Sequence, residues 1–311
     1  MSNSSSTPLR LGTRGSKLAR WQADWVASEL TARGHVIEII EIKTQGDAQQ
    51  QPSLAEVSQA TGTQGLFTKE LQRALLDSQI DFAVHSMKDL PTEPIEGLHV
   101  AAVPQREVAN DVLVGPHSSI DELPTGARIG TGSLRRRAQL LNRRPDLEVA
   151  DLRGNVDTRL RKLSEGQYDA IILAAAGLQR LGLAADISHR IPLDKMIPAP
   201  AQGALAIECR DTDAVTSQAL VALDVPVSRA AVTAERTAMR RLEGGCLAAL
   251  GAHATVKENE LQLAAVVLSE SGDARIHHQQ TSPVEDASTL GTAVADALIE
   301  QGARELLRTR C

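Results

Sequence analysis

Arginine side chains gather in one segment of the chain, between residues 128 and 161, although the formal net charge of the whole protein is −6. In the first half of this segment an apolar piece runs into Gly130-Thr131-Gly132-Ser133, and a helical pattern then begins with Arg135 and Arg136 in its first turn. The helix macrodipole opposes cations at this end of a helix, so a bound anion would explain their position. Guanidinium groups suit bidentate recognition of carboxylate or phosphate. These residues therefore predict a site for a ligand with several negative charges.

A second unit with the same layout follows. Leu147 to Leu152 reads as a strand, Arg153-Gly154-Asn155 as a turn, and a helix from about Val156 carries Arg159. Both turns would lie at the carboxyl ends of parallel strands, where open α/β sheets bind ligands. Charge runs on helices usually lie at the surface. We place there the remaining arginines of the segment: Arg137, Arg143, Arg144 and Arg161.

Length and composition describe a globular protein of two or three domains, with 311 residues and 42% hydrophobic residues. The longest apolar run, Ala170 to Gly177, is far too short to span a membrane. Met1 to Pro8 is Ser-rich and lacks the apolar core of a secretory signal, so we expect a short disordered lead. The three cysteines form no CxxC pair and the eight histidines show no zinc spacing. A reducing compartment and no structural metal are predicted.

The order of predicted elements favours two α/β lobes that resemble periplasmic-type binding proteins, joined by a hinge with the ligand between them. The first lobe would comprise residues 1–103 with 203–222, because 203–209 is apolar enough to be a strand that rejoins it. The second lobe would comprise residues 104–202. The strands and helices expected in the two lobes lie at 9–13, 16–33, 36–42, 68–78, 81–85, 98–103, 112–115, 127–130, 147–151 and 170–174.

Residues 223–311 are predicted to form a small C-terminal α+β domain. Ser228 is expected to cap a long helix that runs to about Arg241, before Gly244-Gly245 and Cys246. Three short strands follow at 251–255, 261–268 and 274–281. A last helix is expected from about Val284 to Arg308, with an interruption near Gly302.

Asp89 is the best candidate for a catalytic carboxylate. It follows an apolar strand and precedes Leu90-Pro91, where the chain must turn. A lone aspartate in such a place often only stabilises the turn, and this alternative stays open. His85 lies inside the strand and is interpreted as a hydrogen-bonded core histidine.

Cys246 is a candidate nucleophile, since it follows two glycines after a helix, where a thiol can be reached. Most single cysteines are inert, so an inert Cys246 is the competing interpretation. Cys209 falls in a predicted strand and is interpreted as a core residue. Cys311 is terminal.

Two other ligand classes fit the arginines less well. Gly130-Thr131-Gly132-Ser133 has no Walker lysine and no third glycine, so neither a P-loop nor a dinucleotide fingerprint is present. Nucleic-acid binding is the stronger rival, but residues 128–161 contain no aromatic side chain for base stacking. The acidic net charge also argues against a phosphate-backbone partner.

Several stretches, in order along nearly the whole chain, together resemble the porphobilinogen deaminases, also called hydroxymethylbilane synthases. The matching stretches are Thr13-Arg14-Gly15-Ser16, Gly65-Leu66-Phe67-Thr68-Lys69-Glu70-Leu71, Val84-His85-Ser86-Met87-Lys88-Asp89-Leu90-Pro91, Gly130-Thr131-Gly132-Ser133-Leu134-Arg135-Arg136, Leu152-Arg153-Gly154-Asn155-Val156-Asp157-Thr158-Arg159-Leu160, Ala175-Ala176-Gly177-Leu178-Gln179-Arg180-Leu181-Gly182, Gln202-Gly203-Ala204, Ala234-Glu235-Arg236 and Leu242-Glu243-Gly244-Gly245-Cys246. Any one of them can arise by chance, whereas the series is specific.

The resemblance implies a transferase that joins four porphobilinogen molecules head to tail, releases ammonia, and frees hydroxymethylbilane by hydrolysis, as a step of tetrapyrrole biosynthesis. It implies a dipyrromethane cofactor that is made from substrate and held by a thioether to Cys246. Asp89 matches the catalytic carboxylate of the family. The implied partners are the pyrrole polycarboxylate alone, with no nucleic acid, membrane or metal, in a monomeric cytoplasmic enzyme. The residues implied to bind cofactor or substrate are Arg14, Gln22, Phe67, Ser86, Lys88, Thr131, Ser133, Arg135, Arg136, Arg153, Arg159, Arg180, Gln202 and Gly203.

The sequence departs from the family pattern at three places. Gln64 stands where a loop lysine is common, Leu247-Ala248-Ala249 follows Cys246 where many members have Val-Pro, and Ala201 replaces a common glycine. The first affects contacts of a loop over the site, and the others affect local backbone shape. Two alternatives from other functional classes remain: a non-catalytic two-lobe receptor for an organic anion, and an RNA-binding protein.

Overall fold

The computed structural model describes residues 7–42, 68–243 and 248–308. The chain forms two compact units, the first from residues 1–106 and 204–229 and the second from residues 107–203 and 230–311. Within the described ranges, every helix is too short or too polar to cross a lipid bilayer. The predicted division into three domains stays a prediction.

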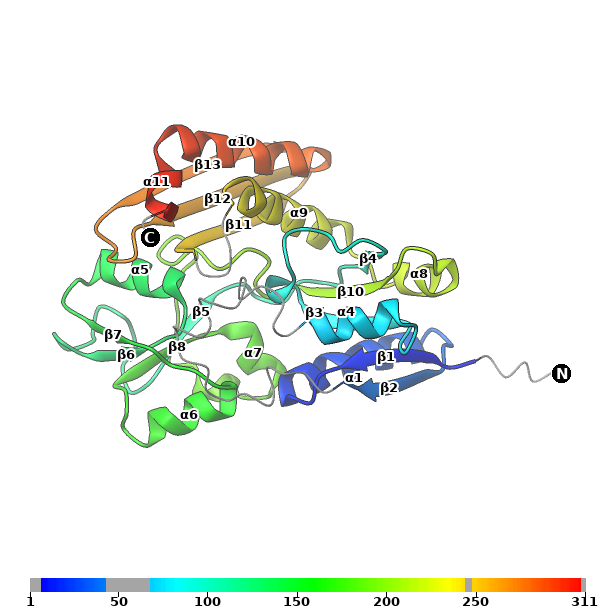
Figure 1. The fold of residues 1–311 in the computed structure, drawn as a ribbon. Helices are drawn as coiled ribbons and strands as arrows, with labels where there is room; N and C mark the ends of the chain where they lie inside the picture. The colour runs from blue at the N-terminus through cyan, green and yellow to red at the C-terminus, as the bar shows by residue number, and fades with distance from the viewer. Residues whose placement is uncertain (1–6, 43–67, 244–247, 309–311) are drawn as a thin grey trace. The chain divides into compact units, whose positions relative to one another are not determined.

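A mixed five-stranded sheet forms the centre of the first unit (Figure 1). β1 is parallel to both β2 and β3, whereas β10 lies antiparallel between β3 and β4. The predicted return strand therefore does rejoin this sheet. In sheet order the strands are β2 (Ile37–Glu41), β1 (Leu9–Thr13), β3 (Phe82–Ser86), β10 (Leu205–Arg210) and β4 (Leu98–Ala102).

Helices cover both faces of the first sheet. α1 (Lys17–Thr31) begins where the Ser16 hydroxyl accepts a hydrogen bond from the Ala19 amide, as its N-cap position predicts. α1 and α8 (Ala214–Val221) contribute to an apolar cluster with Leu11 and Phe82. α4 (Lys69–Leu76) packs on the other face through a separate cluster. A sheet covered on two faces explains why β3 is buried at four consecutive residues, from Phe82 to His85.

The first sheet of the second unit has the order β7-β6-β8-β5-β9. β6 is parallel to β7 and β8, and β5 is antiparallel to β8 and β9. α5 contributes Leu140 to the cluster on one face, and α7 contributes Leu178 to the cluster on the other. The elements are β5 (Asp111–Val114), β6 (Arg128–Gly130), α5 (Leu134–Arg143), β7 (Glu148–Ala150), α6 (Val156–Ser164), β8 (Ala170–Ala174), α7 (Ala175–Arg180) and β9 (His189–Arg190).

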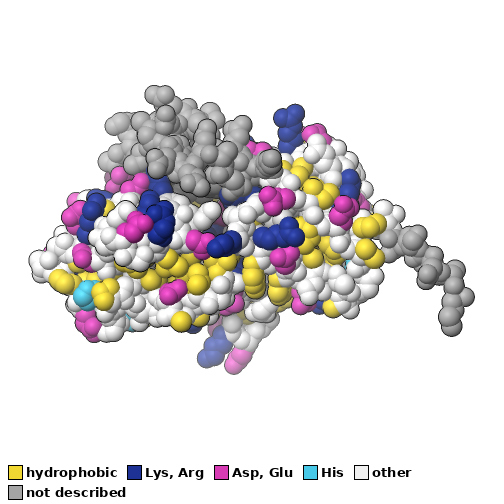
Figure 2. Space-filling view, turned by 90° about the horizontal axis from the view of Figure 1, so that it is seen from below, with side chains coloured by type: hydrophobic (Ala, Val, Ile, Leu, Met, Phe, Trp, Pro, Cys, Tyr) yellow, Lys and Arg dark blue, Asp and Glu magenta, His cyan; other side chains and the backbone are white. Residues whose placement is uncertain are grey.

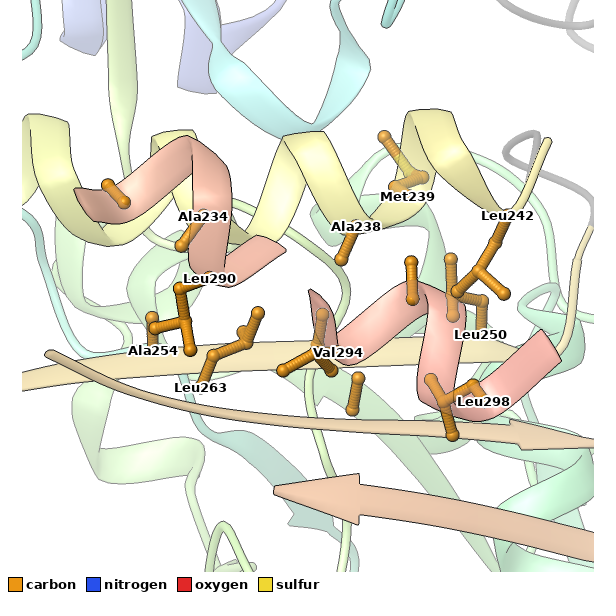
Figure 3. Packing of buried hydrophobic residues seen from close by; sticks show 14 of the residues in the cluster. Ala234, Ala238, Met239, Leu242, Leu250, Ala254, Leu263, Leu290, Val294 and Leu298 are labelled. Atoms are coloured by element: carbon orange, nitrogen blue, oxygen red, sulfur yellow. The ribbon is translucent and has the colours of Figure 1, made fainter. Parts of the chain in front are cut away.

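The rest of the second unit is an antiparallel three-stranded sheet with helices on one face. Figure 3 shows Ala234 and Ala238 of α9 packed near Leu290 and Val294 of α10. The opposite face of this sheet packs on α5 through Ala138 and Val266. The elements are α9 (Pro226–Arg241), of which residues 226–229 belong to the first unit, β11 (Leu250–Lys257), β12 (Glu260–Leu268), β13 (Arg275–Pro283), α10 (Ala287–Glu300) and α11 (Ala303–Arg308).

The predicted fold class, two α/β lobes and a small C-terminal α+β domain, is confirmed by these three sheets. The predicted interruption of the last helix is also confirmed, since α10 ends at Glu300 and α11 begins at Ala303. The predicted start of α9 is wrong. The helix begins at Pro226, and the Ser228 hydroxyl accepts a hydrogen bond from the Arg106 amide instead of capping the helix. Proline suits the first helical position because no intrahelical donor is needed there.

Gly291 sets the distance between α9 and α10. A Cβ atom at this position would lie 2.4 Å from the Ala234 carbonyl oxygen and 2.8 Å from Thr237 Cβ. Glycine to alanine in a helix normally stabilises a protein by about 1 kcal/mol. We expect Gly291→Ala to do the opposite and to lower the free energy of unfolding by about 1–3 kcal/mol, because the two helices must separate.

Denaturant unfolding measures this effect, with Thr292→Ala, an exposed neighbour on the same helix, as the matched control. The control should stay within about 0.5 kcal/mol of the parent protein. A Gly291→Ala protein as stable as the parent would contradict the packing described here.

Candidate active site

The two arginine-bearing turns lie at one edge of the first sheet of the second unit. β6 and β7 are adjacent and parallel, so the turns that follow them leave the sheet at the same end. Gly132 allows their close approach, because a Cβ atom there would lie 2.9 Å from the Leu152 carbonyl oxygen. The Thr131 hydroxyl accepts a hydrogen bond from the Ser133 amide at the start of α5. The predicted position of both turns at carboxyl strand ends is thus confirmed.

Arg135 and Arg136 are buried rather than spread over a helix surface, with 4% and 5% of their area exposed. Both bind Asp111, the first residue of β5. Arg135 Nη1 lies 2.6 Å from Asp111 Oδ2, while Arg136 Nε and Nη2 lie 3.0 and 2.8 Å from Oδ1. Each arginine also donates to a backbone carbonyl. Arg135 Nη1 donates to the carbonyl of Ile197, and Arg136 Nη1 donates to the carbonyl of Ile172.

Asp111 is a central residue that the sequence reasoning missed. Burial favours the neutral acid, but the charges of Arg135 and Arg136 and the hydrogen bonds to the carboxylate outweigh burial and hold the pKa of Asp111 well below its usual range. The available signal was an acidic residue directly before the apolar run Val112 to Val114. That signal does not predict which residues pair with Asp111, because Asp111 precedes Arg135 and Arg136 by more than 20 residues.

Three further predicted residues join this buried network. Gln202 Nε2 donates to Asp111 Oδ1 at 2.9 Å and to the Ala109 carbonyl at 2.7 Å. Arg180, at the end of α7, donates from Nη2 to the Gly203 carbonyl at 2.7 Å. Burial lowers the pKa of Arg180 to about 10, against the opposing charge of Glu107. Arg180 nevertheless stays cationic at neutral pH.

Arg153 and Arg159 lie on the second turn and on α6, and both are half-buried. Arg153 Nε donates to Asp151 at 2.8 Å, and Arg159 Nε donates to the Gly154 carbonyl at 2.7 Å. Together with Thr131 and Ser133 they place cations and hydroxyls along the strand ends. The arginines assigned to the surface have local partners, as in the Arg143–Asp121 pair.

One buried donor in this network has no partner among the described residues. It is Nε of Arg135, whose Nη1 is used by Asp111 and Ile197. An unsatisfied buried donor costs about 1–3 kcal/mol. A ligand oxygen or a water would remove this cost. In the described part of the chain, no group of three or more His, Cys, Asp or Glu side chains is arranged to hold a metal ion.

A second set of predicted residues lies within the first unit. Asp89 ends a short 3₁₀ turn (Met87–Asp89) directly after β3, and its side chain is exposed. The buried Gln22 donates from Nε2 to the Ser86 hydroxyl at 2.9 Å, so these two predicted residues do meet. Arg14 follows β1, which is parallel to β3, and both strands therefore end at the same sheet edge. Lys88 lies beside Asp89 and is half-buried.

The remaining sequence candidates divide into two groups. His85 and Cys209 are buried core residues as predicted, and His85 Nε2 lies 3.1 Å from the buried Glu208 carboxylate. Burial raises the pKa of the Cys209 thiol to about 11, which makes it a poor nucleophile. Phe67, Gln64 and Cys246 lie outside the described residues.

Comparison with known proteins assigns this chain to a family. A family model described as "Porphobilinogen deaminase, dipyromethane cofactor binding domain" matches residues 9–218. A second, described as "Porphobilinogen deaminase, C-terminal domain", matches residues 229–300. Among solved structures, a periplasmic substrate-binding protein of an ABC transporter from Coxiella burnetii covers 69% of this chain and 91% of its own, with a TM-score of 0.42 and 16% identity.

Curated relatives match over almost the full length. A porphobilinogen deaminase from Desulforudis audaxviator is 50% identical over 300 residues, and one from Pelobacter propionicus is 46% identical over 301 residues. In both cases the match covers 96% of this chain and 96% of the relative. On the strength of these matches, the chain belongs to the porphobilinogen deaminase family.

Proposed function

We propose that this chain is an enzyme that joins four porphobilinogen molecules head to tail into hydroxymethylbilane with release of ammonia. Family membership over nearly the whole chain supports this activity. The structural observation that carries it is the buried cationic network at the ends of β6 and β7. Each pyrrole of the substrate bears an acetate and a propionate, so the growing product is a polycarboxylate. Guanidinium groups held at strand ends suit such a ligand.

The residues of the second unit fit a dipyrromethane cofactor. Its four carboxylates match a donor set of guanidinium and hydroxyl groups, and the unpartnered Nε of Arg135 supplies a buried donor. The bound dipyrromethane supplies the pyrrole carbon to which the first substrate is joined. The residues proposed to hold it are Thr131, Ser133, Arg135, Arg136, Arg153 and Arg159. Arg180, Gln202 and Gly203 are proposed to support the same site, since Gln202 donates to Asp111 and Arg180 donates to the Gly203 carbonyl.

Cys246 is proposed to form the thioether to the cofactor. Of the other two cysteines, Cys209 is buried in the core of the first unit with a raised pKa. Cys311 is the last residue of the chain. The family match and the sequence Leu242-Glu243-Gly244-Gly245-Cys246 support the assignment to Cys246.

Asp89 is proposed as the catalytic carboxylate. Loss of ammonia from porphobilinogen leaves a cationic azafulvene, and a carboxylate beside the pyrrole N–H group lowers the energy of that charge. The same oxygen can accept the pyrrole proton and return it. Exposure of Asp89 at the end of β3 leaves it accessible to substrate. Arg14 and Lys88 are proposed to bind substrate carboxylates, with Ser86 and Gln22 fixing the turn.

The cellular setting belongs to the same proposal. We infer a monomeric cytoplasmic enzyme whose partner is the pyrrole substrate, with no nucleic acid and no membrane. On the face drawn in Figure 2, Lys and Arg side chains are interspersed with Asp and Glu rather than gathered in one basic patch. On that face the described side chains therefore do not form the basic stripe expected of a nucleic-acid site.

Intact-mass measurement of the purified protein tests the proposed function. From a host that makes porphyrins, we expect a mass above that of the polypeptide by one dipyrromethane, which peptide mapping places on Cys246. The protein should also give a coloured product with an aldehyde reagent for pyrroles. Cys246→Ser should remove the added mass, and the control Cys209→Ser should keep it. An unmodified polypeptide mass would favour the anion-receptor alternative.

Asp89→Ala tests the catalytic carboxylate. We expect normal thermal unfolding and normal cofactor mass, with turnover of porphobilinogen reduced about 10²–10⁴-fold, the usual contribution of a positioned acid–base group. Asp24→Ala, an exposed aspartate on α1 paired with Arg20, is the matched control and should keep full turnover. Near-normal bilane formation by Asp89→Ala would exclude the role proposed for it.

A further inference from the structure

The carboxylate of Asp111 is fully used by three partners. Its side chain is 0% exposed. Oδ2 accepts from Arg135 at 2.6 Å, and Oδ1 accepts from Arg136 at 2.8 and 3.0 Å and from Gln202 at 2.9 Å. Nε and Nη2 of Arg136 both donate to the single oxygen Oδ1, which restrains the orientation of that guanidinium, and the short bond from Nη1 fixes one end of Arg135. Because the side chain is completely buried, a ligand does not reach this carboxylate directly.

The two guanidinium groups depend on this carboxylate for their closeness. They occupy adjacent positions in the first turn of α5, where the helix macrodipole opposes positive charge. Burial lowers the pKa of Arg136, the charge of Asp111 counters that effect, and the charge of Arg135 adds to it. Without Asp111, two buried cations would repel each other and lose their common acceptor.

The network also leaves a specific donor for a ligand. Arg135 Nη1 is shared by Asp111 and the Ile197 carbonyl, whereas Arg135 Nε has no partner among the described residues. Gln139 holds Ile197 in place, since its Nε2 donates to the Ile197 carbonyl at 2.9 Å and its Oε1 accepts from the Ile197 amide at 2.8 Å. The guanidinium of Arg135 is thus anchored through one nitrogen, while its buried Nε has no hydrogen-bond partner among the described residues.

We propose that Asp111 is a positioning residue for ligand binding: its carboxylate presets Arg135 and Arg136 in the orientation that receives the carboxylates of bound pyrroles. Asp111 itself touches no ligand. This inference rests on the proposed function, because it needs Arg135 to contact the pyrrole carboxylates. Preorganised donors bind more tightly because less freedom is lost on binding. Loss of Asp111 should therefore weaken affinity, in addition to lowering stability.

The chain contains a matched control for this idea. In the first unit, Asp81 also binds two arginines, with Arg10 Nη2 at 2.8 Å and Arg210 Nη2 at 3.2 Å. Asp81 precedes β3, at the end opposite Asp89. Asp81→Asn and Asp111→Asn therefore remove the same charge from the same kind of arginine pair, and only Asp111 lies in the proposed binding network.

The experiment measures porphobilinogen binding by calorimetry in a Cys246→Ser background, which prevents covalent attachment. Thermal unfolding of each variant is recorded alongside. We expect both Asp→Asn changes to lower the melting temperature. Only Asp111→Asn should raise the Kd for porphobilinogen, by about tenfold or more, as when one charge-assisted hydrogen bond is lost. Asp81→Asn should stay within about twofold of the parent. A Kd unchanged in folded Asp111→Asn overturns the inference.

Arg135→Leu separates failure of this inference from failure of the proposed function. If Arg135→Leu weakens binding and Asp111→Asn does not, Asp111 is structural only and the proposed ligand role of Arg135 stands. If neither change weakens binding, the ligand role of Arg135 fails as well.

A charge-balanced pair covers the case in which Asp111→Asn alone does not fold. Arg136→Met is then compared with Arg136→Met/Asp111→Asn, where the buried cation and anion are removed together. The inference predicts weaker porphobilinogen binding by the double variant than by Arg136→Met. Equal affinity of the two would overturn it.

Discussion

The second unit depends on one buried carboxylate that neutralises part of a larger buried positive charge. Asp111 binds Arg135 and Arg136 at the start of α5, where neither burial nor the helix macrodipole favours a cation. Two guanidinium groups on one carboxylate leave a net positive charge in the interior. A buried positive charge of this kind costs less free energy when a bound ligand anion neutralises it. The ion pairs therefore connect the stability of the unit with the chemistry proposed for it.

The strand arrangement places further polar and charged side chains beside this local charge. β6 and β7 end side by side, so Thr131 and Ser133 from one turn lie along the same edge as Arg153 from the next. In the first unit, β1 and β3 end together in the same way and present Arg14 and Asp89. Both units thus use the carboxyl edge of a sheet, where backbone donors and short turns are available. This shared arrangement supports the proposal that carboxylate-bearing pyrroles bind at these edges.

Much of this arrangement could be predicted from sequence pattern. Apolar runs that end in Gly130-Thr131 and in Arg153-Gly154 specify strand, turn and helix locally, and the sheets confirm them. The partner of the arginines could not be predicted, because Asp111 lies on another strand and reaches them only through the fold. The start of α9 was misplaced for a related reason. A serine near a helix start resembles a cap, but Ser228 binds the amide of Arg106, more than 100 residues earlier in the chain.

The most direct test of this account is the NMR signal of the Arg135 Nε–H group, assigned with an Arg135→Lys variant. It is compared between protein that carries the cofactor and Cys246→Ser protein that does not. The account predicts a clear shift and slower hydrogen exchange of this one signal in the loaded protein, because a ligand carboxylate then occupies the unpartnered donor. An identical signal in both proteins would contradict the claim that the network around Asp111 receives the pyrrole carboxylates.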